Sequence, residues 1–248
     1  MGRGNRAALR AGLRARKPVP VVARLQIIPS FGLFVDEEEV RLPMAVQRVV
    51  VFLAVHDRPV LRPFCSGTLW PEGTEAQASA NLRSALWRVN RDGYGILDVD
   101  GAALRLAPSV DIDLRRLTEL ARRIAAGAEM SSLDPEAFDR DVLPDWYDDW
   151  LVIERERYHQ LRLHALEAMS ERLTEAGDLA NALVAALAAV AGEPLRESAH
   201  RALARVHLAE GNRAEAVRQL ELYRDLLHEQ LNLEPSDQIV ELVRSTPG

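Results

Sequence analysis

The stretch ANLRSALWRVNR, residues 80–91, decides how the first half of this 248-residue chain is interpreted. At about 100° of rotation per residue in an α-helix, the small and aliphatic side chains in and just before it fall on one stripe. That stripe consists of Ala78, Leu82, Ala85, Leu86 and Val89. The spacing therefore predicts an amphipathic helix that buries this stripe against a core.

The opposite side of the predicted helix carries arginines and a tryptophan. The residues that lie away from the apolar stripe are Arg83, Ser84, Trp87, Arg88 and Arg91. Arginine can donate paired hydrogen bonds to guanine O6 and N7 or to phosphate, so this face is a candidate for DNA contact. Two alternatives stay open. Arginine-rich exposed faces are common on helices that bind nothing, and the second half of the chain is another cover for Trp87.

Short segments with β propensity and proline signals precede this helix. VVARLQII, FGLFV and EVRL predict three small strands, starting at residue 21. Pro43 suits the first turn of a helix that runs to about His56. A second, short helix is expected between Pro63 and Pro71, although Gly67 within it costs about 1 kcal/mol relative to alanine.

The third helix has signals at both ends, and a hairpin follows it. Thr74 is placed to cap the helix, with Gln77 returning the hydrogen bond, and Asp92-Gly93 ends it. Asp100-Gly101 then joins two β-type runs, which is a strong hairpin signal. Strands, three helices and a hairpin within residues 21–110 make the plan of a winged helix-turn-helix domain, in which the third helix enters the major groove.

Two further arginines of this domain are candidates for phosphate contacts. They are Arg62, at the start of the second helix, and Arg48, on the first. The hairpin tip, residues 98–101, is acidic, which argues against deep insertion into the minor groove.

Residues 111–248 predict an all-α domain. Helical spacing of leucines after Asp111, a short helix near Asp134-Pro135 and a long helix over about 145–176 come first. Gly177-Asp178 then recurs as Gly211-Asn212, and Ala182 recurs as Ala216, both at a spacing of 34 residues. This is the period of tetratricopeptide repeats. The predicted fold class is therefore mainly α with a small β component: a winged helix-turn-helix followed by a tetratricopeptide-like domain.

Charge is distributed unevenly along the chain. Residues 1–110 hold 15 Arg and Lys against 10 Asp and Glu, whereas residues 111–248 hold 16 against 27. The net charge is therefore +5 over residues 1–110 and −11 over residues 111–248. This distribution suits a protein that meets phosphate at one end and protein at the other. Residues 1–20 are expected to form a flexible basic tail.

The composition also argues against several classes of protein. Lys17 is the single lysine and Cys65 the single cysteine, so we expect no lysine-dependent catalysis, no disulfide and no thiolate metal site. The histidines are scattered, and no catalytic or cofactor-binding motif occurs. Without a membrane-length apolar run or a secretory signal, we expect a cytoplasmic protein that is not an enzyme, with no metal and no cofactor.

Several long stretches resemble a known family. The run LRPFCSGTLWPEGTEAQASANLRSALWRVNRD, the segment LPDWYDDWLVIERER and the ending LNLEPS are similar to the Streptomyces antibiotic regulatory proteins, which combine an OmpR-type winged helix with a bacterial transcriptional activator domain. The resemblance covers about residues 21–240. The chain departs from it at Cys65-Ser66-Gly67, which weakens a helix that is usually sturdier in the family.

The resemblance implies a transcriptional activator. Such proteins bind direct repeats in promoter DNA, usually as two protomers side by side, and recruit RNA polymerase through its sigma and alpha subunits, commonly at secondary-metabolite gene clusters. It also implies that the loop between the second and third helices meets polymerase. That loop consists of Trp70, Pro71, Glu72, Gly73 and Thr74. Because the chain resembles members without an ATPase domain, no nucleotide switch is expected.

One alternative function, from a class of protein that does not bind DNA, remains. In it the tetratricopeptide-like domain is the working part, and the protein is an interaction adaptor whose winged helix docks protein rather than DNA.

Overall fold

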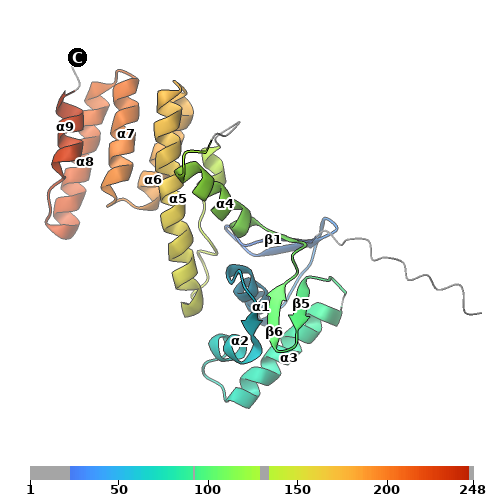
Figure 1. Cartoon of the computed structure of the whole chain (residues 1–248). Coiled ribbons are helices and arrows are strands. Elements are labelled where there is room, and N and C mark those ends of the chain that lie inside the picture. Colours follow the sequence, from blue (N-terminus) through green and yellow to red (C-terminus); the bar gives the residue numbers. More distant parts are fainter. Residues whose placement is uncertain (1–22, 92, 129–133, 246–248) are drawn as a thin grey trace, which may run out of the picture.

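The computed structural model describes residues 23–91, 93–128 and 134–245. In it the chain forms two lobes, a winged-helix lobe and an elongated helical lobe (Figure 1). Most of the described residues outside loops are helical and the sheets are small, which confirms the expected fold class. The predicted basic tail, residues 1–20, lies outside the described residues.

The first sheet has the strand order β3-β2-β1-β7. Its strands are β1 (Ala23–Gln26), β2 (Gly32–Val35), β3 (Glu38–Glu39) and β7 (Val110–Ile112). The first three correspond to the three predicted strands and pair antiparallel, but β3 is shorter than the run EVRL and overlaps it only at Glu39. β7 was not predicted. It pairs parallel to β1, with Leu25 opposite Ile112, so the end of the winged-helix lobe returns to its first strand.

Three helices form the body of the winged-helix lobe: α1 (Met44–Val55), α2 (Arg62–Leu69) and α3 (Glu75–Arg91). All three lie close to the predicted ranges. Pro43 stands at the N-cap of α1, and the Thr74–Gln77 capping box forms as expected. The backbone N–H of Thr74 donates to Oε1 of Gln77 at 2.9 Å, and the N–H of Gln77 donates back to Oγ1 of Thr74 at 3.3 Å.

The wing is a three-stranded antiparallel sheet rather than a simple hairpin. The predicted strands are β5 (Leu97–Asp100) and β6 (Ala103–Leu106), and Gly101 has the positive φ that the tight turn requires. A third strand, β4 (Val60–Leu61), pairs with β6 on the other side. It connects α1 to α2 and so fixes both helices to the wing.

The helical lobe begins directly after β7. It contains α4 (Asp113–Ala125), the short 3-10 helix η1 (Pro135–Phe138), α5 (Asp149–Glu175), α6 (Leu179–Gly192), α7 (Glu197–Ala209), α8 (Arg213–Leu231) and α9 (Asp237–Ser245). Asp134 caps η1, where the sequence predicted a helix start. Among the described residues, no helix has both the length and the hydropathy needed to cross a bilayer.

The 34-residue repeat corresponds to equivalent turns in the helical lobe. Gly177, between α5 and α6, and Gly211, between α7 and α8, have φ values of 80° and 78°. Ala182 and Ala216 are both fully buried at matching positions of α6 and α8. The long helix α5 is thus the first helix of the first repeated hairpin, and α9 packs against α7 and α8 at the end of the array.

The two lobes share a hydrophobic core at their joint. Leu143, Leu151 and Tyr158 from the second lobe are buried in the same cluster as the core of the winged-helix lobe. The backbone N–H of Leu143 donates to the carbonyl of Ile27 at 3.1 Å. The edge of Trp150 meets the ring of Phe52 on α1 at 5.2 Å between centroids. The segment LPDWYDDWL, residues 143–151, therefore ties the helical lobe onto the winged helix.

A buried carboxylate completes this joint. Asp113, the first residue of α4, is 8% exposed and accepts hydrogen bonds from the backbone N–H groups of Ile27, Ile28 and Leu114 at 2.7–3.1 Å. Burial raises the pKa of this carboxyl, and the three N–H groups oppose that shift. β1 and the start of α4 are consequently held by one side chain, across the expected boundary at residues 110 and 111.

Candidate nucleic-acid interface

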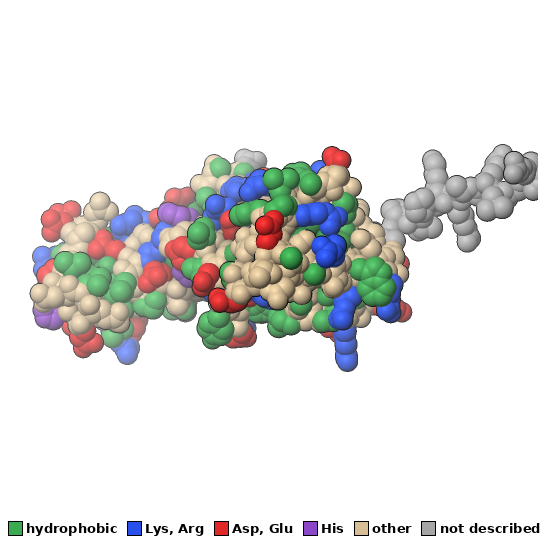
Figure 2. Space-filling model, turned by 90° about the horizontal axis from the view of Figure 1, so that it is seen from below, with side chains coloured by type: hydrophobic (Ala, Val, Ile, Leu, Met, Phe, Trp, Pro, Cys, Tyr) green, Lys and Arg blue, Asp and Glu red, His purple; other side chains and the backbone are tan. Residues whose placement is uncertain are grey.

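The recognition face is defined here as the outward residues of α3 that the sequence singled out: Arg83, Ser84, Trp87, Arg88 and Arg91. All five are exposed, whereas the predicted stripe of Ala78, Leu82, Ala85, Leu86 and Val89 is buried. The helical phase predicted from the sequence is therefore confirmed. Figure 2 shows arginine side chains gathered over the winged-helix part of the underside of the molecule.

Trp87 lies uncovered on this face. It is 59% exposed, so the helical lobe does not cover it, which removes one of the alternatives left by the sequence. The guanidinium carbon of Arg91 lies 5.4 Å from the centroid of its indole ring. This cation–π contact holds the arginine close to the ring. A flat aromatic surface and a cation are thus presented together near the end of α3.

Arg88 extends between two shallow hollows beside α3. One, of about 270 Å³, is lined by Arg41, Leu42, Pro43, Trp87, Arg88 and Arg91. In the part of the chain that the structure describes, Arg88 makes no hydrogen bond or ion pair with another residue, so its five N–H donors face solvent. Arg41 was not predicted as a site residue. It precedes α1 by sequence and comes close to α3 only through the fold.

The other hollow, of about 230 Å³, places Ser84 beside Trp70. Arg83 is held along the helix, since its Nη1 donates to Oγ of Ser79 at 2.9 Å. The small side chain of Ser84 leaves the helix backbone accessible at this point.

The two predicted phosphate contacts outside α3 have different surroundings. Nε of Arg48 donates to Asp148 at 2.9 Å and its Nη2 lies 2.6 Å from the same carboxylate, so this arginine is neutralised within the joint between the lobes. Arg62 is half-buried, and its backbone N–H donates to the carbonyl of Ala102 at the wing turn. Of these two arginines, Arg62 is the one whose guanidinium is not paired with a carboxylate of the described residues.

The wing contributes little positive charge. Arg105 on β6 pairs with Asp98 on β5 at 2.5 Å, and Asp100 stands at the tip. The acidic character expected from the sequence is thus reinforced, because the strand arginine of the wing is neutralised by its cross-strand neighbour.

The loop between α2 and α3 is short and mostly exposed. Pro71, Glu72, Gly73 and Thr74 are exposed, while Trp70 is half-buried against the core. The backbone N–H of Trp70 donates to the carbonyl of Ser66 at 3.0 Å, which ends α2. Trp70 therefore anchors the loop, and the other four residues form its accessible surface.

The single cysteine of the chain is buried and does not contribute to this surface. Cys65 is fully buried on α2, and burial raises the pKa of its thiol to about 12, which makes it a small apolar core residue. Within residues 23–91, 93–128 and 134–245, no group of three or more His, Cys, Asp and Glu side chains is arranged to hold a metal ion.

Comparison with known proteins assigns the helical lobe to a family and shows what fold the chain shares. The family model described as the bacterial transcriptional activator domain matches residues 113–245. Among solved structures, the chain is similar to Mycobacterium tuberculosis EmbR in complex with a low affinity phosphopeptide. The TM-score is 0.68 at 18% identity, and the match covers 92% of this chain and 66% of that one. A search of curated proteins gave no match.

The matched residues begin at the first residue of α4 and end at the last residue of α9, so they take in the whole described helical lobe. This confirms the resemblance on which the sequence interpretation depended. The likeness to EmbR covers 92% of this chain, so it extends into the winged helix as well, and it shows the fold. The chain belongs to the bacterial transcriptional activator domain family and is a transcriptional regulator of the Streptomyces antibiotic regulatory protein type.

Proposed function

We propose that this protein is a sequence-specific activator that inserts α3 into the major groove of promoter DNA. The observation that carries the proposal is the phase of α3. Its apolar stripe is sealed in the lobe, while Arg83, Arg88 and Arg91 stay exposed. Guanidinium groups in this arrangement suit guanine edges and phosphates.

Within this proposal the exposed residues divide into two roles. Arg88, Ser84 and Trp87 lie along the outward side of α3 and are assigned to the groove, with the indole ring against thymine methyls or sugars. Arg62 and the newly identified Arg41 flank the helix and are assigned to phosphates. Arg48 is left out of the DNA contacts because Asp148 neutralises it.

The assembly on DNA follows from the family resemblance. We propose two protomers side by side on direct repeats, with the exposed loop residues Pro71 to Thr74 meeting the sigma or alpha subunit of RNA polymerase. The net charge of −11 over residues 111–248 keeps the helical lobe away from the phosphate backbone and available to protein. A secondary-metabolite gene cluster is the proposed target.

Binding to promoter DNA and footprinting test this function. The full chain is titrated into fluorescent fragments from the region upstream of its own gene and into random duplexes of equal length, at matched salt. We expect tighter binding to one upstream fragment and two protected patches about one helical turn, or 10–10.5 base pairs, apart on one side of the duplex. If no upstream fragment exceeds random DNA, the adaptor function replaces the activator function.

A further inference from the structure

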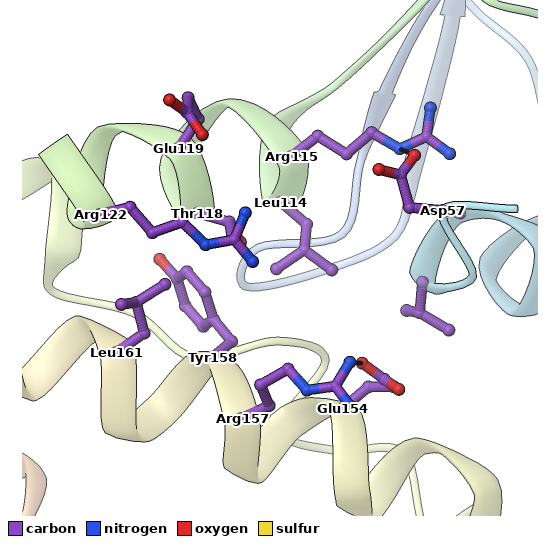
Figure 3. Close-up of a pocket in the computed structure, with 12 residues that line it drawn as sticks. Asp57, Leu114, Arg115, Thr118, Glu119, Arg122, Glu154, Arg157, Tyr158 and Leu161 are labelled. Carbon is purple, nitrogen blue, oxygen red and sulfur yellow. Dashed lines mark hydrogen bonds and ion pairs between the residues drawn. The ribbon is translucent and has the colours of Figure 1, made fainter.

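A cavity lies at the joint between the two lobes. Its volume is about 310 Å³, and it is lined by the end of α1, by α4 and by α5 (Figure 3). This is near the lower limit for cavities that bind small organic molecules. Leu114, Val55 and Leu161 give it an apolar floor.

One buried hydrogen-bond donor of this cavity lacks a partner. Among the buried side-chain atoms without a hydrogen-bond partner in the described residues, Oη of Tyr158 belongs to a residue that lines the cavity. Tyr158 is 2% exposed, and burial raises the pKa of its hydroxyl, which therefore stays a donor at neutral pH. Leaving buried donors unpaired costs free energy that an acceptor would recover.

Charges of both signs line the same space, since Asp57, Glu119 and Glu154 accompany three arginines. In Figure 3 the side chains of Arg115 and Arg122 come from α4 and that of Arg157 from α5. Arg157 is neutralised by Glu154 at 2.8 Å. Nε of Arg115 lies 3.3 Å from a carboxylate oxygen of Asp57, but Asp57 is 87% exposed, so water screens that pair.

Arg122 is the least compensated of the three. Its side chain makes no hydrogen bond or ion pair with any other residue that the structure describes, and in Figure 3 it extends across the cavity next to Tyr158. The Arg122 guanidinium group and the Tyr158 hydroxyl are both donors. They match an acceptor that carries negative charge on a planar group, which is a carboxylate.

We propose that this cavity is a binding site for a small organic carboxylate with an apolar body. The carboxylate pairs with Arg122 and accepts from Tyr158, while its hydrocarbon part covers Leu114, Val55 and Leu161. Because α1 belongs to the winged-helix lobe and α4 and α5 to the helical lobe, a bound ligand holds the two lobes together and stabilises the folded chain by mass action.

Calorimetry and melting of the full-length chain test this site. The probes are benzoate and octanoate, with benzamide as the uncharged counterpart of benzoate and inorganic phosphate as an anion without an apolar part. We expect millimolar benzoate or octanoate to raise the Tm and to give a binding isotherm, while benzamide and phosphate do neither. Tyr158→Phe and Arg122→Gln each weaken carboxylate binding about tenfold or more.

Arg123→Gln is the matched control. Arg123 is the next residue of α4, equally exposed, and does not line the cavity, so its variant binds like the original chain. The Tm without ligand shows that each variant is folded. The proposal is wrong if neither carboxylate binds, if benzamide or phosphate binds as well as benzoate, or if Tyr158→Phe and Arg122→Gln leave the affinity unchanged.

Discussion

Arg48 on α1 and Asp148 immediately before α5 form an ion pair across the joint of the molecule, with 2.6 Å between Nη2 and Oδ1. The same oxygen of Asp148 also accepts from the indole N–H of Trp150 at 3.1 Å. Since the two side chains are only 25% and 18% exposed, solvent screens this pair less than it screens the surface pairs of the helical lobe. The pair therefore couples the stability of the lobes.

We expect Arg48→Ala and Asp148→Ala to destabilise the chain non-additively. Each single change leaves the other charge without its partner, so the double variant loses less than the sum of the two. A double-mutant cycle in urea should give a coupling free energy of about 1 kcal/mol. The affinity for DNA should stay near that of the original chain. A coupling close to zero together with weakened DNA binding would restore Arg48 as a phosphate contact.

Arg88→Ala should weaken DNA binding without unfolding the protein. Its side chain is exposed and unpaired within the described structure, so the loss falls on the complex alone. If Arg88 binds phosphate, the slope of log affinity against log salt falls by about 1; if it reads a base, the cost is about 1–3 kcal/mol at one position of the site. Arg218→Ala is the control, because Arg218 is 70% exposed on α8, in the other lobe.

Leu86→Ala should have the opposite effect. Leu86 is 4% exposed on the buried stripe of α3, and removing most of its side chain leaves a cavity that costs about 2–5 kcal/mol of unfolding free energy. Trp87→Ala, at the adjacent residue on the exposed face, should cost far less. Thermal melts of the two variants compare them directly, and equal losses would mean that the helical phase of α3 is incorrect.

Two glycine substitutions should change stability in opposite directions. A Cβ at Gly67, on the exposed side of α2, meets nothing within 4 Å, so Gly67→Ala should stabilise the chain by about 0.5–1 kcal/mol. A Cβ at Gly192, the last residue of α6, would lie 2.6 Å from Cδ2 of Leu163 and 2.9 Å from Nη2 of Arg162. Gly192→Ala should therefore cost about 1–3 kcal/mol. Chemical denaturation measures both, and a gain at Gly192 would contradict the packing described for α5 and α6.

The helical lobe should lose stability on mild acidification through His200. Burial lowers the pKa of this imidazole below its ordinary value of 6.5, while its bond to the carbonyl of Pro194 and the charge of Glu197 oppose the shift. The unfolded chain therefore takes up this proton first. The contribution of His200 is complete above pH 6.5 and is lost as the pH falls below that value.

His200→Gln removes this titration. Unfolding free energies measured between about pH 7.5 and pH 5 should fall more steeply for the original chain than for the variant. Parallel curves would show that His200 is equally easy to protonate in both states.

The features that the sequence predicts well are those set by local spacing. The apolar stripe from Ala78 to Val89 fixes the phase of α3, because a helix repeats every 3.6 residues whatever surrounds it. The box of Thr74 and Gln77, and the turns at Gly177 and Gly211, follow from short-range backbone requirements. The exposed face of α3 followed from the same periodicity.

Features that depend on distant residues could not be predicted in this way. β4 and β7 are two and three residues long, too short to show an alternating pattern, and they exist because β6 and β1 offer them hydrogen bonds. Arg48 finds its carboxylate 100 positions along the chain, and Arg41 reaches the surroundings of Arg88 only when the helices pack. The local sequence pattern therefore indicates one arginine that is already neutralised, Arg48, and misses one that is exposed, Arg41.

The parallel pairing of β1 with β7 has a consequence for how the protein is made. On the ribosome, β1 is among the first segments to emerge, yet its second neighbour and the Asp113 carboxylate follow some 85 residues later. Until then one side of β1 exposes unsatisfied backbone groups to any other nascent strand. A fragment that stops at residue 110 would leave the strand in that state permanently, so a stable winged helix needs the rest of β7 and the start of α4.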